Sequence, residues 1–511
     1  MKMRLVLLML ILKDSLTAQN SFSYYYPFDS YGSSFTTMLV ERDTILLQGY
    51  FIDTIAPYLQ GMAFAKIDTS GNLITYQRYF DSKGRDFAYP PLNNIIKLSD
   101  GRYLTVGITL QDDALQLVFL SPNFQVDTVF EYFANDPTVQ VNWVRSAFEL
   151  TDGYLVFGSA QRLSFASDGQ IFKVSKDGEL LWRKWYGFAN KDEVIGDVLP
   201  YTDSTFIVGS FHKPFPVNSD DKKRNTWIYE VDVNGIILNE FVDPDPFSGT
   251  SGGFVIDQFQ NIFYTGASIV VDQYGQHNAL GRIGMLDSHF QLKWKQEFGK
   301  NLHIQTGFAD MVMLGNRLIA VGSHVDSSRT ISGAPNGFIA GWFGSASILG
   351  DSICEKLDTA QWFAEQGRSM GFFNMVDTLS SGSIITCGYG WFGPDGNNYR
   401  EYAWLVKTPN PPCDELKVSL NEIDPRAKDW SISPNPTSGN LFIKFDKGKY
   451  YNNPSFYLFN AVGRIVKRFT IREQTSFCEI FLDGLPNGSY VLQSFNSKGQ
   501  ETGFEEVIII K

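Results

Sequence analysis

One pattern of apolar and polar positions returns seven times along the chain. A turn is followed by four mostly apolar residues and then by glycine, at residues 45–49, 103–107, 154–158, 205–209, 262–266, 318–322 and 384–388. The glycines recur at intervals of 51 to 66 residues. Short apolar runs bounded by turn residues are typical of buried strands, and a recurrence at this spacing is typical of repeat architectures. The pattern therefore predicts repeated β-sheets.

A second signature follows several copies of this pattern: a strand ends in a turn with glycine, and a further strand begins. It is clearest at residues 65–71, 172–178 and 229–235. Each repeat therefore has four short strands in a meander, which is the content of a propeller blade. A blade cannot bury both faces alone and must stack on its neighbours, whereas a β-sandwich gives no reason for the repetition. We predict an all-β fold in which residues 19–410 form a seven-bladed β-propeller.

The two ends of this region predict how the ring closes. The seventh repeat has only three predicted strands before the proline-rich residues 408–412, and an additional strand at residues 22–30 precedes the first repeat. We predict that this N-terminal strand completes blade seven by pairing with the strand at residues 403–406, because closure removes two open sheet edges. At the repeat glycines, a side chain would crowd a neighbouring backbone or turn.

Composition narrows the class of protein. The chain has 511 residues, of which 43% are hydrophobic and 15% aromatic, and its formal net charge is -12. Because no block of basic residues is present, nucleic acid is excluded as a partner. Residues 1–18 have the basic start, apolar run and small-residue cleavage site of a secretory signal peptide. No segment has the roughly 20 apolar residues that span a bilayer, and we expect a monomer.

The four cysteines do not form a dense disulfide framework or a CxxC pair. Cys387 lies inside an apolar strand pattern, so we expect a buried free thiol there. A bridge between Cys354 and Cys413 is one open alternative for an exported chain, and Cys478 completes the set. The connectivity cannot be read from the sequence.

The C-terminal region changes character. Residues 411–429 are rich in proline and charge and indicate a linker, and residues 430–511 contain several short strands separated by turns, which predicts a small β-sandwich. The region opens on PNPTSG, continues with a hairpin containing N–x–x–G–R and an L–P–x–G–x–Y segment, and ends on apolar residues and a lysine. The motif residues are Pro434, Asn435, Pro436, Thr437, Gly439, Asn460, Gly463, Arg464, Leu485, Pro486, Gly488, Tyr490 and Lys511.

These ordered motifs closely resemble the type A C-terminal sorting domain of type IX secretion cargo, a family found in the Bacteroidota. The resemblance implies that the N-terminal signal takes the chain across the inner membrane and that the tail directs export across the outer membrane, through contact with the type IX secretion machinery. It also implies that a surface protease removes the tail and often joins the new end to lipopolysaccharide. The preceding repeats resemble uncharacterised repeat propellers, and that likeness implies no activity.

Catalytic and metal-binding patterns are sparse. The five histidines are not at ligand spacing and we expect them to be solvated loop residues; the chain contains no Walker motif. Recurring acids such as Asp68 and Asp232 are expected to bond backbone N–H groups in turns. The acidic pairs at residues 112–113, 192–193 and 220–221 are interpreted as mostly solvated loops. We therefore predict no catalytic residues, cofactor or metal.

Binding is the better functional interpretation, because propeller loops vary freely on a rigid scaffold. The longest predicted loops, at residues 211–225, 324–336 and 391–399, carry aromatics that suit an unknown glycan or protein ligand. These candidate residues are Phe215, Trp391, Phe392 and Tyr399. The leading prediction is a secreted or cell-surface propeller that serves as a binding or structural module. The alternative is a glycan-cleaving or other hydrolytic propeller, which requires two carboxylates from different blades facing each other.

Overall fold

The computed structural model divides the chain into two compact units, Met1–Glu415 and Leu416–Lys511. The described residues form strands, turns and loops and contain no α-helix. The signal peptide predicted at residues 1–18 and the linker predicted at 411–429 lie outside them, so those boundaries stay predictions. The structure describes residues 21–26, 28, 30–42, 44–88, 95–162, 166–188, 191–214, 224–245, 248, 251–271, 277–299, 306–326, 338–351, 353–358, 370–392, 400–408, 430–445, 455–460, 465–471, 477–495 and 501–510.

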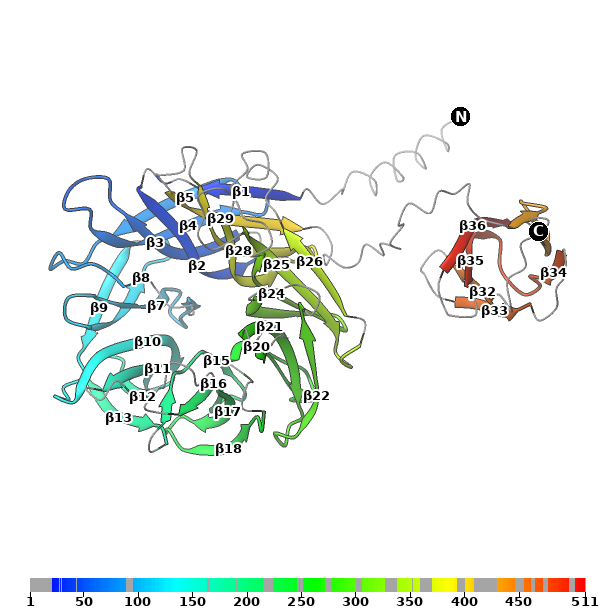
Figure 1. The fold of residues 1–511 in the computed structure, drawn as a ribbon. Coiled ribbons are helices and arrows are strands. Elements are labelled where there is room, and N and C mark those ends of the chain that lie inside the picture. Colours follow the sequence, from blue (N-terminus) through cyan, green and yellow to red (C-terminus); the bar gives the residue numbers. More distant parts are fainter. Residues whose placement is uncertain are drawn as a thin grey trace. The chain divides into compact units, whose positions relative to one another are not determined.

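Four antiparallel sheets follow one another in the middle of the first unit, each with its strands in chain order (Figure 1). The first two contain β6 (Ile96–Lys97), β7 (Tyr103–Ile108), β8 (Leu115–Leu120) and β9 (Val126–Tyr132), then β10 (Val139–Leu150), β11 (Gly153–Arg162), β12 (Ser167–Ser175) and β13 (Leu180–Tyr186). The third contains β14 (Lys191–Glu193), β15 (Asp197–Pro200), β16 (Thr205–Pro214), β17 (Asn225–Asp232) and β18 (Ile237–Val242). The fourth contains β19 (Ser251–Ile256), β20 (Ile262–Val271), β21 (His277–Leu286) and β22 (Leu292–Phe298).

The remaining strands of this unit belong to one 12-stranded sheet, which single parallel pairs divide into three antiparallel groups. One group is β23 (Thr306–Leu314), β24 (Arg317–Asp326), β25 (Phe338–Ser347) and β26 (Cys354–Asp358). The second is β27 (Met370–Thr378), β28 (Ile384–Phe392), β29 (Arg400–Thr408) and β1 (Phe22–Tyr26). The third is β2 (Gly32–Glu41), β3 (Thr44–Ile52), β4 (Gln60–Asp68) and β5 (Leu73–Tyr79).

The predicted pairing of the N-terminal strand is confirmed. β1 pairs with β29 in antiparallel register, from Phe22 opposite Lys407 to Tyr26 opposite Ala403. Figure 1 shows the sheets arranged around a ring in chain order, with β1 and β29 side by side. The N-terminal strand therefore supplies the outer strand of a group whose other three strands lie at the far end of the unit.

Apolar cores lie between successive sheets. Leu117 of β8 packs in one cluster with Val156 of β11, and Phe157 of β11 packs in another with Val208 of β16. The junction of the last and first groups has the same construction, since Tyr26 of β1 shares a cluster with residues of both β28 and β2. The second and third strands of the groups, such as β7 and β8, are buried on both faces, which explains the nearly continuous apolar runs in the sequence.

The repeat glycines have a steric cause. In several repeats the first strand of the group carries a β-bulge directly opposite the glycine, and the bulged backbone approaches closely. A Cβ at Gly158 would lie 2.0 Å from Trp143 O, and one at Gly388 would lie 1.8 Å from Phe372 O. Gly49 and Gly322 meet backbone oxygens in the same way. The prediction that a side chain would crowd the backbone is confirmed at these positions.

The second repeated signature also has a physical explanation. The carboxylate of Asp68 accepts backbone N–H groups from Ser70 and Asn72, both at 2.8 Å, and Asp232 makes equivalent bonds in its own turn. The predicted role of these acids is confirmed. The carbonyl oxygen of the turn glycine then accepts a hydrogen bond from a tyrosine hydroxyl on the outer strand of the preceding group. These bonds run from Tyr26 to Gly71 O (2.8 Å), from Tyr132 to Gly178 O (2.9 Å) and from Tyr186 to Gly235 O (2.6 Å).

The cysteines are in different states. Cys387 is a fully buried free thiol, as predicted, and burial raises the pKa of this thiol. Cys478 is also free, whereas Cys354 is disulfide-bonded. Cys413, the remaining cysteine of the chain, lies outside the described residues.

The second unit contains two small antiparallel sheets that share one apolar core, which includes Trp430, Phe456 and Tyr490. One sheet has the order β30 (Trp430–Ser433), β31 (Asn440–Phe445), β34 (Phe477–Phe481). The other has the order β33 (Ile465–Thr470), β32 (Ser455–Asn460), β35 (Gly488–Phe495), β36 (Glu501–Ile509).

Candidate functional sites

Residues of the predicted sorting motif hydrogen-bond to the last strand of the second unit. The side-chain oxygen of Asn435 accepts the N–H of Ile508 at 2.8 Å. Thr437 forms a parallel bridge with Ile509, and its own N–H and carbonyl bond to the backbone on either side of that residue, at 2.8 and 2.9 Å. Several polar groups of the motif therefore hold the end of β36 beside the start of the domain.

The hydroxyl of Thr437 fixes the turn itself. This residue is 2% exposed, and its hydroxyl donates to Asn440 O at 2.5 Å and accepts the N–H of Gly439 at 3.2 Å. Pro434 and Pro436, by contrast, are exposed. The prolines are therefore accessible to a partner, whereas the threonine maintains the fold.

The later motif residues are brought to one end of β35. Tyr490 is buried and donates its hydroxyl to Pro486 O at 2.8 Å, and Leu485 packs against the same core. Asn460 is paired with Tyr490 across β32 and β35, and Gly488 begins β35. Gly463, Arg464 and Lys511 lie outside the described residues.

The four candidate binding aromatics cannot be assembled into a site. Phe215 and Tyr399 lie outside the described residues. Trp391 and Phe392 form the end of β28, paired with Glu401 and Arg400, and the structure describes their backbone alone. Their role in binding stays a prediction.

Two histidines correct the expectation that all five are solvated. His324 is 0% exposed and His212 is 1% exposed, because both lie on second strands that neighbouring sheets cover. The ring of His212 stacks on Trp227 and lies 3.1 Å from a carboxylate oxygen of Glu193. Glu193 itself is fully buried, so the acidic pair at residues 192–193 is not simply a solvated loop. His289 is exposed, as expected.

Three carboxylates on first strands link neighbouring groups of the ring. Each carboxylate accepts a hydrogen bond from a backbone N–H on the first strand of the following group. The same side-chain-to-backbone bond therefore recurs along the inner part of the ring. The bonds run from Phe254 of β19 to Asp197 of β15, from Val376 of β27 to Asp310 of β23 (2.9 Å), and from Val40 of β2 to Asp377 of β27.

Burial by the surrounding strands perturbs these acids. It raises the pKa of Asp197 to about 6 and, together with the nearby Asp197 charge, raises the pKa of Asp310 to about 8. The pKa of Asp377 is also raised by burial. Carboxylates from different repeats therefore do occur on the inner strands, as the hydrolytic alternative requires, but each of them already bonds to the next group of strands.

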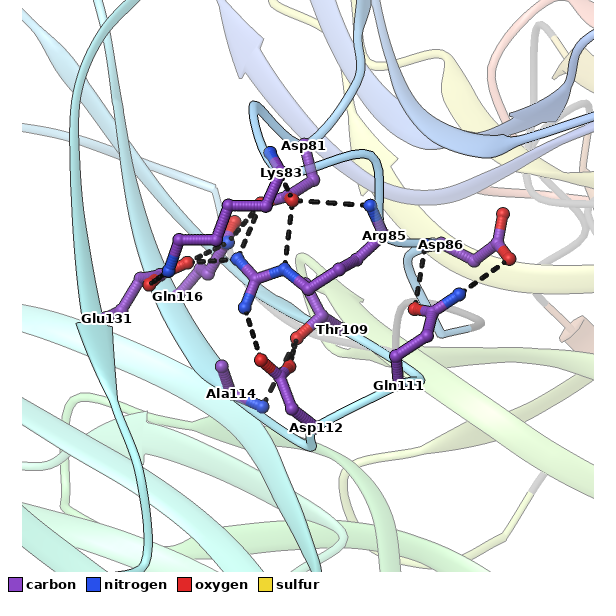
Figure 2. A network of polar contacts seen from close by, with 10 residues as sticks. All are labelled: Asp81, Lys83, Arg85, Asp86, Thr109, Gln111, Asp112, Ala114, Gln116 and Glu131. Carbon is purple, nitrogen blue, oxygen red and sulfur yellow. Dashed lines mark hydrogen bonds and ion pairs between the residues drawn. The ribbon is translucent and has the colours of Figure 1, made fainter.

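A denser polar network surrounds Arg85, between β5 and β6 (Figure 2). Its guanidinium binds both oxygens of Asp81, at 2.9 and 2.7 Å, and donates to Asp112 at 2.7 Å and to Glu131. The Asp81 carboxylate raises the pKa of Arg85, so the cation is permanent. Arg85 thereby connects the loop after β5 with the β7–β8 loop and with β9, and it fixes the position of Asp112.

A pocket of about 330 Å³ opens beside this network, between the β6–β9 sheet and the beginning of β10. Its walls come from the β7–β8 loop and from the connection between β9 and β10. Its lining combines polar and apolar residues, and its one large aromatic side chain, Phe133, is 38% exposed. The lining residues are Asp112, Asp113, Phe133, Ala134, Asn135, Asp136, Pro137, Val139, Gln140 and Asn142.

The charges of the pocket are largely balanced. Burial alone would raise the pKa of Asp112, but hydrogen bonds from Thr109 and Arg85 lower it. Asp136 forms an ion pair with Arg162 at 3.0 Å. Asp113 differs, because burial and the neighbouring Asp112 charge raise its pKa.

Asn142 contributes a buried donor that has no partner. It is 1% exposed, and its Nδ2 atom has no hydrogen-bond acceptor within the described residues. The Nε2 atom of Gln170 lies 3.2 Å from Trp143 O and 3.1 Å from Ser159 O, and it also contacts Oδ1 of Asn142. The Oδ1 atom of Asn142 therefore faces Gln170, and its Nδ2 atom is buried in the wall of the pocket.

Sequence reasoning noticed only part of this site. The pair Asp112–Asp113 was visible as adjacent acids and was interpreted as a solvated loop, whereas Asp112 is ion-paired with Arg85 in a pocket wall. No sequence signal separates Asn142 from other asparagines, since its burial depends on Gln170 of another strand.

Comparison with known proteins identifies the second unit. Residues 431–511 match the family described as the secretion system C-terminal sorting domain. A comparison of the sequence with curated proteins found no match. No helix among the described residues has the length and apolarity needed to cross a membrane.

Several solved structures resemble the chain at low identity. The polysaccharide lyase Uly1 has a TM-score of 0.44 and 8% identity, over 76% of this chain and 94% of that one. The extracellular domain of the putative one-component system BT4673 from B. thetaiotaomicron has a TM-score of 0.27 and 11% identity, over 94% and 68%. The GH43 β-1,3-galactosidase BT0265 has a TM-score of 0.31 and 10% identity, over 70% and 74%. Such distant likenesses carry no activity to this chain.

The family match and the predicted motifs agree on the same residues. Residues 431–511 are a C-terminal sorting domain of the type IX secretion system, and the protein is cargo exported to the cell surface or secreted.

Proposed function

We propose that the exported part of this protein is a seven-bladed β-propeller that acts as a binding module outside the cell. Every group of strands in the first unit has at least four members, and apolar clusters join each group to the next. The junction between the group containing β1 and the group containing β2 is built like the others, which supports a closed ring. Closure leaves few open sheet edges, which suits a protein that works outside the cell.

The export route follows from the two ends of the chain. Residues 1–18 act as a cleaved signal for the inner membrane, and residues 430–511 form a β-sandwich that the secretion machinery recognises and that is removed at the surface. Deletion of residues 430–511 should leave the protein in the periplasm, as measured by cell fractionation and by antibody labelling of intact cells. Normal surface labelling of the shortened chain would contradict this route.

The buried, unpaired donor of Asn142 is the observation that carries the binding function. An unsatisfied buried amide costs about 1 to 3 kcal/mol, and such groups often mark a place where another molecule completes the bond. Here Asn142 forms part of the wall of a pocket at the junction of two sheets, with its Nδ2 atom buried in that wall. The inner carboxylates, by contrast, already bond to neighbouring strands. A binding role therefore accounts for the polar groups better than a hydrolytic one.

Cells that display the protein provide the test. Cells with the full chain should retain fluorescent oligosaccharides or peptides that cells lacking the gene do not, as measured by flow cytometry. Equal retention by both kinds of cell, across neutral, anionic and cationic probes, would contradict the binding function.

A further inference from the structure

We propose that the pocket beside Arg85 binds an uncharged carbohydrate. This inference rests on the proposed binding function and adds the chemical class of the ligand. The pocket volume of about 330 Å³ lies at the small end of the range for ligand sites, about 300–1,000 Å³. It therefore has room for a short segment of a glycan.

Two of the three pocket carboxylates, Asp112 and Asp136, are ion-paired, and among the described residues Asp113 has no such pair, which disfavours strongly charged ligands. Asp112 is neutralised by Arg85 at 2.7 Å and Asp136 by Arg162 at 3.0 Å, so neither carboxylate needs a cationic ligand. Both guanidinium groups are in turn engaged by carboxylates, and neither is among the lining residues. An anionic sugar would therefore meet carboxylates at the pocket surface without a free cation to bind it.

The remaining polar groups suit hydroxyls. Asn135 and Gln140 are exposed and offer amide donors and acceptors, and Asn142 adds a buried, unpaired donor in the pocket wall. Carboxylates such as Asp112 accept hydroxyl protons while they stay in their ion pairs, because a carboxylate has about four acceptor positions. A ligand with several neighbouring hydroxyls satisfies such a lining, because each hydroxyl both donates and accepts.

Phe133 supplies the apolar part of the site. Its side chain is 38% exposed, and its carbonyl oxygen accepts a hydrogen bond from Arg183 at 2.9 Å. This bond restrains the backbone that carries the ring. The apolar face of a sugar ring can lie against such a side chain, and the burial of apolar surface then contributes to affinity. A cationic peptide would have to compete with Arg85 for Asp112 and with Arg162 for Asp136. Within the described residues no group of three histidine, cysteine, aspartate or glutamate side chains that could hold a metal ion was found.

The purified full-length protein should be applied to an array of neutral, sulfated and uronate-containing glycans, and binders should then be titrated by calorimetry. We expect binding to neutral glycans. Phe133→Ala and Gln140→Ala should each weaken that binding at least tenfold. Both residues are exposed, so the fold should persist, and circular dichroism checks this. Gln125→Ala is the matched control, because Gln125 is exposed in the turn between β8 and β9, in the same sheet but outside the pocket. It should leave the affinity unchanged.

Three outcomes would overturn the inference. Neutral-glycan binding that survives both pocket substitutions would place the glycan elsewhere and leave the binding function intact. Binding confined to sulfated or uronate glycans, or to cationic peptides, would refute the ligand class. A correctly folded protein that binds no glycan and no peptide would count against the ligand class and the binding function together.

Discussion

The hydroxyl of Tyr26 provides a direct test of ring closure by the N-terminal strand. We expect Tyr26→Phe to lower the opening free energy of the β1–β29 pair by about 1 to 1.5 kcal/mol, the usual net contribution of one hydrogen bond. The change removes the 2.8 Å bond to Gly71 O. It keeps the aromatic ring, which is 8% exposed and packs on Phe28 and Phe35. The effect should therefore reflect the bond rather than lost packing.

Hydrogen exchange measured by mass spectrometry reports on this pair directly. Amides of residues 403–407 in β29 face β1 or β28, and those facing β1 exchange when the two strands separate. A loss of about 1 to 1.5 kcal/mol should speed their exchange by about 5- to 12-fold. Peptides from the β6–β9 sheet should exchange at an unchanged rate.

Tyr132→Phe is the matched control, because it removes an equivalent bond, to Gly178 O, at a junction away from the chain ends. It should speed exchange around that junction and leave β29 unaffected. If Tyr132→Phe has this local effect but Tyr26→Phe changes nothing in β29, the reasoning that the Tyr26 bond stabilises ring closure is refuted.

Three further predictions follow from the geometry. Gly388→Ala should lower the free energy of unfolding by about 3 kcal/mol in urea, because a Cβ there lies 1.8 Å from a backbone oxygen, whereas Gly307→Ala, which meets open space, should change little. Asp310 has a folded pKa of about 8 against an ordinary value of 3.8. The stability that this group contributes should therefore be fully present at low pH and decline as pH rises toward 8, by up to about 1.4 kcal/mol per pH unit. Asp310→Asn should flatten that slope, and an unchanged slope would contradict the raised pKa of Asp310. Thr437→Val should destabilise the second unit by about 1 to 2 kcal/mol and reduce surface display, while Ser438→Ala, at an exposed neighbour, should do neither.

Features that repeat were readable from the sequence because their causes are local. The apolar runs, the Asp–x–x–Gly turns and the repeat glycines each reflect backbone geometry within one group of strands. The pairing of β1 with β29 was also predictable, since the seventh repeat lacked a strand and an additional strand was predicted at residues 22–30, before the first repeat. The sorting domain was identified by ordered motifs, and Asn435 and Thr437 prove to fasten its last strand.

Features that depend on contacts between different groups of strands could not be predicted from the sequence. His212 and His324 were expected in solvent, yet adjacent sheets bury them. Asn142 becomes a buried donor only because Gln170, on a different strand, occupies its oxygen. Similarly, Asp310 is an unremarkable acid in sequence, and its perturbation arises from β27 and from Asp197. Neither periodicity nor composition encodes these juxtapositions.

The pairing of β1 with β29 also has a consequence for the timing of folding. Tyr26 pairs with Ala403, 377 positions later, so closure must wait until almost the whole first unit has been synthesised. Bringing such distant segments together is slow, because the entropy of a long loop is lost before any contact repays it. During that interval the chain stays incomplete, with one unpaired sheet edge. Under the proposed export route, in which residues 1–18 direct the chain across the inner membrane, this delay favours transport of the unfolded chain, because ring closure requires β1 and β29 on the same side of that membrane.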